Sequence, residues 1–316
     1  MAVSRRKLSV VLGLAVASAG LLVLAATPRA LSPERLFNAI SAESGIVTHR
    51  GLAYGPGPRH RLDIYRAPAG RERRALVVFY YGGGWTEGER ATYAFVANAL
   101  AARGYTTVVP DYRLFPEVRY PDFLDDAVAA YRWTRSSLAG GCGAPRPVVV
   151  MGHSAGAYIA AMVALDGMLR RGTGAPLPAP AALIGLAGPY AFDPTTWPST
   201  KAIFAPAAGR PDRARPVAFV RGPAPPALIM HGSADTIVQL YNSRDLVAVL
   251  RASGNVAVGI EYPRLGHVGL LTAIARPLRW RGTVLDDIAD FIERHAGGEA
   301  EPEACAGPPP VRRSKA

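Results

Sequence analysis

The chain of 316 residues is predicted to form an α/β fold, a mostly parallel central sheet with helices on both faces. Short apolar runs rich in β-forming residues alternate with longer helical runs, as a parallel sheet requires, because a crossover must carry the chain back before each new strand. In the helical run 122–138, Leu124, Val128 and Tyr131 recur at i, i+4 and i+7. This spacing places one apolar stripe against a sheet.

The expected elements follow in order along the chain. Strands are expected at 75–80, 106–110, 148–151, 181–186, 227–230 and 256–262, and helices at 93–103, 122–138, 155–169, 243–253 and 283–295. Two earlier strands, 47–54 and 61–66, flank Gly55-Pro56-Gly57-Pro58 and are expected to pair as an antiparallel hairpin at the sheet edge.

Three further segments depart from the alternation. A short helix is expected within 32–44, with Ser32 as its cap and Pro33 in its first position. The Gly/Pro-rich stretch 172–180 is expected to be a loop. The long proline-rich segment 190–226 is expected to be a functional lid or an irregular connection, because loops of that length are uncommon in compact domains.

Composition and charge exclude several classes of protein. Hydrophobic residues make up 49% and charged residues 19%, so the chain can bury a large core and is not a disordered chain. The formal charge is +12, and 33 of the 36 cationic residues are arginines. They are scattered rather than clustered, which argues against a nucleic-acid-binding face. An arginine-biased proteome and affinity for an anionic membrane surface both remain explanations of the excess.

An export segment is expected at the N-terminus. Residues 8–26 carry no charge and follow Arg5-Arg6-Lys7, the order of an export signal. The run of 19 residues exceeds the usual apolar region of a cleaved signal, about 7–15 residues, and approaches the roughly 20 that span a bilayer. Cleavage and anchoring both stay open, and the rest of the chain is expected outside the cytoplasm, in a periplasmic or similar compartment.

The sequence thus predicts a signal peptide or membrane anchor at 1–31, one folded domain at 32–296 and a disordered tail at 297–316. Cys142 and Cys305 could pair in an oxidising compartment, although Cys305 lies in the tail. No Cys-x-x-Cys or His-x-x-x-His spacing is present, so no metal site is expected, and no cofactor.

The strongest chemical signal is Gly152-His153-Ser154-Ala155-Gly156, which lies between an expected strand and an expected helix. This strand-turn-helix context is typical of a serine nucleophile on a sharp, strained turn. Glycines on either side avoid side-chain clashes in such a turn. The N-terminus of the following helix would direct its positive dipole end at the reacting oxygen.

A serine nucleophile needs a base and an orienting carboxylate. Asp235 lies 81 residues after Ser154 and follows one expected strand. His267 lies 32 residues after Asp235 and follows the next expected strand. Both are therefore expected at the same carboxyl edge of the sheet as Ser154, where open α/β sheets place their sites.

Three other residues are weaker candidates for these roles. His153 lies inside the turn itself and His231 precedes the acid, so both are expected to pack or to support the site rather than act as the base. Asp193 is a reserve candidate for the acid, less favoured because it precedes the irregular segment.

A glycine-rich loop, Tyr80-Tyr81-Gly82-Gly83-Gly84-Trp85, closes the strand expected at 75–80. Glycines let the backbone approach a substrate and direct N–H groups at an oxyanion. The expected donors are the N–H groups of Gly83, Gly84 and Ala155. Tyr81, Trp85 and the segment 197–204 are candidates to line the substrate pocket, with ordinary core packing as the alternative.

These residues resemble the α/β-hydrolase superfamily, and within it the carboxylesterases of the hormone-sensitive-lipase-like and acetyl esterase group. The resemblance covers about 47–295, and its most diagnostic stretch is Asp111-Tyr112-Arg113-Leu114-Phe115-Pro116-Glu117. It implies that Ser154, Asp235 and His267 form a catalytic triad and that the loop 82–84 forms the oxyanion hole. It also implies that Arg113 and Glu117 brace the sheet.

One residue departs from the family pattern, because the position of the family's histidine before the three glycines holds Tyr81. The loop's usual side-chain brace is changed, while its backbone donors remain. The chain is also similar to the bifunctional feruloyl and acetyl-xylan esterase-like branch, which assigns a fold more safely than a substrate.

The expected function is that of a serine carboxylic-ester hydrolase acting on small, short-chain esters through an acyl-enzyme. Hydrolysis of a small formamide and a catalytically silent hydrolase fold that binds a ligand at the cell envelope are the alternatives. Nucleic acid is not expected as a partner. Membrane association through 8–26 and the oligomeric state both stay open.

Overall fold

The structure is a computed structural model that describes residues 32–140, 144–172 and 175–297. The predicted export segment at 8–26, both cysteines and the tail from residue 298 lie outside the described residues. Within the described ranges, every helix is too short or too polar to cross a membrane.

The chain divides into two compact units, residues 1–40 and 41–316. The described part of the first contains helix α2 (Pro33–Ile40), which ends before the predicted limit at residue 44. The Ser32 hydroxyl accepts a hydrogen bond from the Arg35 N–H at 3.4 Å, in agreement with its predicted role as the cap.

The larger unit is built on a sheet of eight strands in the order β1-β2-β4-β3-β5-β6-β7-β8. The strands are β1 (Val47–Ala53), β2 (Arg61–Arg66), β3 (Leu76–Tyr80), β4 (Thr106–Pro110), β5 (Val148–His153), β6 (Ala182–Leu186), β7 (Ala227–Gly232) and β8 (Ala257–Tyr262). Strands β3 to β8 are mutually parallel, and β2 runs antiparallel to both β1 and β4. The predicted α/β class and the hairpin at the sheet edge are confirmed.

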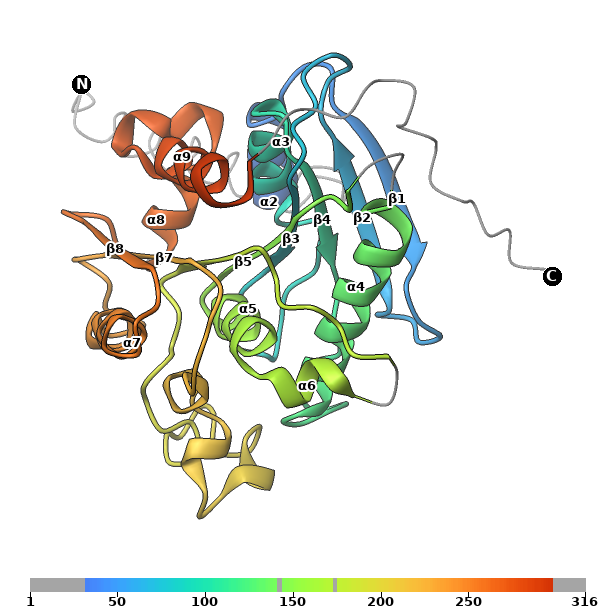
Figure 1. The fold of residues 1–316 in the computed structure, drawn as a ribbon. Helices are drawn as coiled ribbons and strands as arrows, with labels where there is room; N and C mark the ends of the chain where they lie inside the picture. Colours follow the sequence, from blue (N-terminus) through green and yellow to red (C-terminus); the bar gives the residue numbers. More distant parts are fainter. Residues whose placement is uncertain (1–31, 141–143, 173–174, 298–316) are drawn as a thin grey trace, which may run out of the picture. The chain divides into compact units, whose positions relative to one another are not determined.

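Helices cover both faces of this sheet, as predicted (Figure 1). Helices α3 (Ala94–Ala102) and α9 (Val284–Ala296) lie on one face, and α4 (Asp122–Leu138), α5 (Ala155–Leu165) and α7 (Tyr241–Ala252) lie on the other. The central strands β3 to β7 are buried along their whole length, which explains why they read as continuous apolar runs.

Two helical predictions need correction. The helix predicted at 155–169 ends at Leu165, because the Asp166 side chain accepts hydrogen bonds from the N–H groups of Met168 and Leu169 and starts the separate helix α6 (Gly167–Arg171). Helix α8 (His267–Thr272) and the 3₁₀ turn Arg276–Arg281 were not predicted.

The long segment 190–226 is packed against the sheet's helices rather than open. It contains 3₁₀ turns at Ala205–Ala207, Pro211–Arg213 and Pro216–Phe219, and the last of these contacts α5 and α7. Phe204 is fully buried, with its ring 5.6 Å from that of Tyr158, and the Tyr158 hydroxyl donates to the Ala214 carbonyl at 2.9 Å. The segment is therefore an irregular connection anchored on α5.

An ion pair braces the segment that follows β4. Asp126, buried on α4, accepts two parallel bonds from the Arg113 guanidinium, Nη2 to Oδ1 at 2.7 Å and Nε to Oδ2 at 2.9 Å. His60 Nε2 also lies 3.1 Å from Asp126 Oδ1. The resemblance implied Glu117 as the companion of Arg113, but Glu117 is exposed and the partner is Asp126.

We expect Asp126→Asn to lower the free energy of unfolding by about 2 kcal/mol, because it removes a charge-assisted bidentate pair from a buried site. Urea denaturation followed by tryptophan fluorescence measures this difference. Asp125→Asn, at the exposed neighbouring position of the same helix, is the matched control and should change stability by less than about 0.5 kcal/mol. Equal effects of the two substitutions would contradict the assigned role of Asp126.

Candidate active site

Ser154 lies at the sharp turn between β5 and α5. Its backbone is in the left-handed region, with φ 56° and ψ −125°, a strained conformation for a residue with a side chain. A Cβ on Gly152 would lie 2.1 Å from the Gly156 carbonyl oxygen, and one on Gly156 would lie 2.0 Å from that of Tyr80. Gly156 is therefore required by the close approach of the turn to the end of β3, and Gly152 by the close approach of the two sides of the turn to each other.

Asp235 and His267 lie after β7 and β8, and the structure joins them directly. His267 Nδ1 lies 2.7 Å from Asp235 Oδ2. Because a carboxylate only accepts hydrogen bonds, Nδ1 carries the proton and Nε2 carries the free lone pair. This is the tautomer that a general base needs.

The carboxylate of Asp235 is completely enclosed and held at both oxygens. Its other oxygen, Oδ1, accepts hydrogen bonds from the N–H groups of Ile237 at 2.9 Å and Val238 at 3.0 Å. Burial raises the pKa of this carboxyl, but the hydrogen bonds from His267, Val238 and Ile237 outweigh burial and hold the pKa below its usual range. Asp235 is therefore ionised at neutral pH.

His153 links the serine turn to the histidine loop. Its Nε2 donates to the backbone carbonyl of His267 at 3.0 Å, and the two imidazole rings lie 4.6 Å apart between centroids. Burial and the neighbouring His267 lower the pKa of His153 to about 3, so it stays neutral. The residue next to Ser154 thus contacts the His267 loop directly.

His231 is also buried and contacts the acid, with Nε2 3.2 Å from Asp235 Oδ2. Burial lowers its pKa. Asp193, the reserve candidate for the acid, instead accepts hydrogen bonds from the N–H and hydroxyl of Thr195 at 2.8 and 2.6 Å. The Asp193 carboxylate therefore stabilises a local turn. The carboxylate that contacts His267 is that of Asp235.

The glycine loop lies beside the nucleophile. A Cβ on Gly82 would lie 3.0 Å from the Ser154 Cβ, and Gly83 and Gly84 have φ values of 123° and 58°, which only glycine adopts readily. Across the described ranges, the backbone N–H groups of Gly83, Gly84 and Ala155 donate no hydrogen bond to another residue. All three N–H groups are therefore available to a ligand.

Tyr81 and Trp85 were predicted to line the substrate pocket, and their burial argues against that. Tyr81 is completely buried, stacked between Tyr93 and Tyr112 with centroids 5.2 and 4.8 Å away. Trp85 is 3% exposed and packs edge-on against Phe204 at 4.9 Å. Almost none of the surface of either ring is open to a substrate. Both rings therefore support the glycine loop by packing against neighbouring aromatic side chains.

The hydroxyl of Tyr81 braces the glycine loop in place of the family's histidine. It donates to Asp111 Oδ1 at 2.9 Å and accepts from Arg59 Nη2 at 2.8 Å. Asp111 is paired in turn with the Arg90 guanidinium. Arg59 and Arg90 were not predicted, since nothing in their sequence surroundings marks them as partners of the loop.

Comparisons with known proteins agree with this arrangement. The apo form of esterase 2 from Thermogutta terrifontis superimposes with a TM-score of 0.67 at 23% identity, covering 81% of this chain and 97% of that one, which shows the same fold. Esterase LipC of Mycobacterium tuberculosis is 30% identical over 70% of this chain and 60% of its own length. Esterase LipQ of the same organism is 28% identical over 82% of this chain and 66% of its own.

This chain therefore spans roughly two thirds or less of the length of these two relatives. The sequence pattern of a family described as having the alpha/beta hydrolase fold matches residues 77–271, a span that holds Ser154, Asp235 and His267. The chain belongs to this α/β hydrolase family.

Proposed function

We propose that the protein is a serine hydrolase of carboxylic esters. The observation that carries the proposal is the buried hydrogen bond between Asp235 and His267 at the sheet edge where Ser154 occupies a strained turn. The relatives LipC and LipQ, both named as esterases, support hydrolysis of an ester bond.

The tautomer of His267 sets the order of the proposed steps. His267 Nε2 takes the proton of the Ser154 hydroxyl while the serine oxygen attacks the ester carbonyl carbon. The resulting tetrahedral intermediate breaks its bond to the alkoxy group, which leaves as the alcohol with the proton from His267. A water molecule then repeats these steps on the acyl-serine and releases the carboxylic acid.

The oxyanion of each tetrahedral intermediate would be held by the N–H groups of Gly83, Gly84 and Ala155. Ala155 is also the first residue of α5, so the positive end of that helix adds to the stabilisation. Asp235 is ionised and faces the His267 ring, where it would stabilise the imidazolium that forms in each step.

We propose that the acyl group is short. Aromatic rings fill the space behind the glycine loop, where Trp85 packs against Phe123, Tyr158 and Phe204 with centroids 6.2, 5.3 and 4.9 Å away. A packed core leaves little room for a long apolar chain without displacing one of these rings.

We also propose that residues 8–26 export the protein from the cytoplasm, as their uncharged composition after Arg5-Arg6-Lys7 indicates. Fractionation of cells that express the full chain, with N-terminal sequencing of the recovered protein, tests both export and cleavage.

A fluorophosphonate probe should label the purified protein at Ser154, because such probes react with an activated serine. Ser154→Ala should lose both the adduct and the hydrolysis of p-nitrophenyl acetate, with its thermal unfolding midpoint retained. Absence of an adduct on the wild-type protein, or an equal adduct on Ser154→Ala, would refute the serine hydrolase assignment and favour a silent binding fold.

Rates over p-nitrophenyl esters from acetyl to long-chain acyl groups should fall with chain length. We expect kcat/KM to drop by roughly tenfold or more between butyrate and laurate, because the longer chain must displace a buried ring at a cost of about 1–3 kcal/mol. A rate that rises with chain length would contradict the short-acyl proposal.

Acid should destabilise the protein well above the usual range of carboxylate protonation. His153 is neutral in the folded state with a pKa of about 3, whereas the unfolded chain binds its proton near pH 6.5, so stability is lost as the pH falls below 6.5. We expect a loss of about 2 kcal/mol from His153 between pH 7 and pH 5, with His231 acting in the same direction. Guanidinium denaturation at the two pH values measures it, and a flat profile would refute burial of neutral histidines.

A further inference from the structure

His231 stands at the end of β7, four residues before the acid, and its ring is almost completely enclosed. Its Nε2 lies 2.9 Å from the Val238 carbonyl oxygen and 3.2 Å from Asp235 Oδ2. Since a carbonyl and a carboxylate only accept hydrogen bonds, Nε2 carries the proton. The other ring nitrogen, Nδ1, then accepts from the Ser243 hydroxyl of α7 at 2.7 Å.

The contacts of His231 help to hold the turn that carries Asp235 in place. Asp235 Oδ1 is bound by the N–H groups of Ile237 and Val238 in the same turn, so those bonds orient the carboxylate only relative to that turn. His231 adds a bond from the sheet to the Val238 carbonyl and a proton beside Oδ2. The backbone N–H groups of Ser233 and Ala234 also bond the start of the turn to the Tyr262 and Leu265 carbonyls, while His231 connects the later part of the turn, and the oxygen facing His267, to strand β7.

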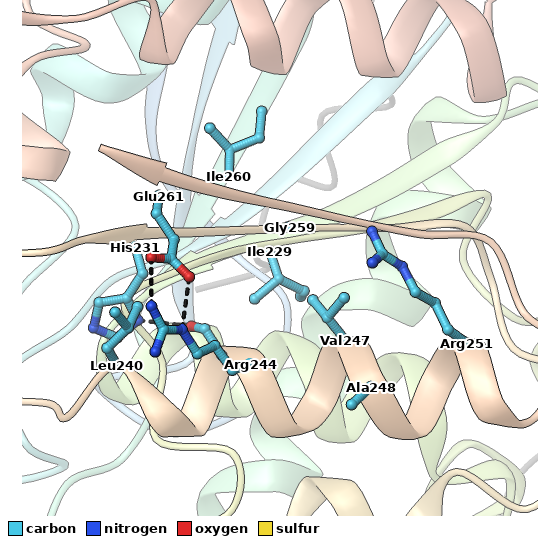
Figure 2. A pocket seen from close by; sticks show the side chains of 11 residues that line it. Ile229, His231, Leu240, Arg244, Val247, Ala248, Arg251, Gly259, Ile260 and Glu261 are labelled. Atoms are coloured by element: carbon cyan, nitrogen blue, oxygen red, sulfur yellow. Dashed lines mark hydrogen bonds and ion pairs between the residues drawn. The ribbon is translucent and has the colours of Figure 1, made fainter. Parts of the chain in front are cut away.

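Burial lowers the pKa of His231, which keeps its ring neutral although charged and titratable groups face it. His267 and Asp235 face it from the loops after β8 and β7, and His153 approaches from the end of β5. On its outer side, Glu261 of β8 and Arg244 of α7 form an exposed bidentate ion pair, at 2.7 and 2.8 Å. Figure 2 shows His231 beside this pair, in the wall of a 250 Å³ pocket between α7 and strands β7 and β8.

We propose that His231 is a positioning residue for the reaction: its Nε2–H holds the carboxylate of Asp235 in register with His267, and Ser243 holds the ring of His231 in the required tautomer. This inference rests on the proposed function of Ser154, Asp235 and His267. A packing role alone would require the shape of the ring but not its proton.

Two substitutions that differ by one methylene separate these roles. In His231→Gln the amide nitrogen replaces Nε2 and keeps donors for Asp235 and Val238. In His231→Asn the shorter side chain replaces Nδ1, keeps the contact with Ser243 and leaves Oδ2 without its second donor. Arg244→Gln, which breaks the exposed ion pair in the same pocket wall, is the control.

We expect His231→Asn to lower kcat by roughly ten- to a hundredfold with KM changed less than about twofold, because only the alignment of the acid and base is disturbed. Loss of the neutral donor leaves more negative charge on Oδ2, which favours protonated His267. The acid limb of the kcat/KM profile should therefore move to higher pH by about half a unit. His231→Gln should recover most of kcat and the wild-type limb, and Arg244→Gln should match the wild type.

A measurement on the unmodified protein covers the case in which a variant does not fold. ¹⁵N-histidine NMR should show His231 protonated at Nε2 and unprotonated at Nδ1 at neutral pH and above. The opposite tautomer, or equal kcat and acid limb in His231→Asn and the wild type, overturns the inference.

Failure of the proposed function gives a different result. A wild-type protein that neither hydrolyses esters nor reacts with a fluorophosphonate would refute the esterase proposal. The tautomer of His231 still tests the contact in that case, because it does not depend on catalysis. A proton on Nδ1 rather than Nε2 would show that His231 does not donate toward Asp235.

Discussion

The close approach of the β5–α5 turn to the end of β3 is the constraint on which the rest of the site depends. The Tyr80 and Tyr81 carbonyl oxygens lie 2.0 and 2.4 Å from where a Cβ of Gly156 would be, so the backbones of two neighbouring elements meet without any side chain between them. That contact brings the glycine loop alongside Ser154, and it forces the serine into a left-handed conformation. The strain at one residue is maintained by sheet pairing on both sides, since β3 and β5 are adjacent parallel strands.

A second constraint concerns charge. Three histidines surround the site, yet burial lowers the pKa of His153 and of His231, and both donate from Nε2 to backbone carbonyls. A proton on Nδ1 of His231 would break the hydrogen bond from Ser243, and a proton on Nδ1 of His153 would place a charge at a buried atom that has no hydrogen-bond partner. In the proposed reaction, the proton of Ser154 would pass to His267, the one of the three whose Nδ1–H faces the ionised Asp235. Because His153 and His231 stay neutral, only His267 would act as the base in the proposed reaction. Three freely titrating imidazoles would compete for the proton.

Sequence reasoning succeeded where local pattern decides the structure. The central strands are continuous apolar runs because both faces of the sheet are covered. The turn 152–156 can be recognised by its glycines and by its place between a strand and a helix. It failed where partners come from distant segments. Pocket lining and core packing could not be told apart for Tyr81 and Trp85 until the rings that bury them were known. The bond between Arg113 and Asp126 of α4 joins two segments that no local pattern connects. Helix α8 was missed because six residues are too few for a periodic pattern.

The arginine excess also looks different once its contacts are known. Several guanidinium groups donate to backbone carbonyls of irregular segments, namely those of Arg59, Arg74, Arg146, Arg215 and Arg279. Arg170 donates to two carbonyls in the last turn of α5, and Arg251 to the first carbonyl of β8. Several of them bind two carbonyls at once, which a planar group with five donors can do and a lysine ammonium on a flexible stem does less well. In a fold with the long irregular segment 190–226 between β6 and β7, such anchors satisfy loop carbonyls that lack a sheet or helix partner. These arginines therefore have a structural role in holding irregular segments in place.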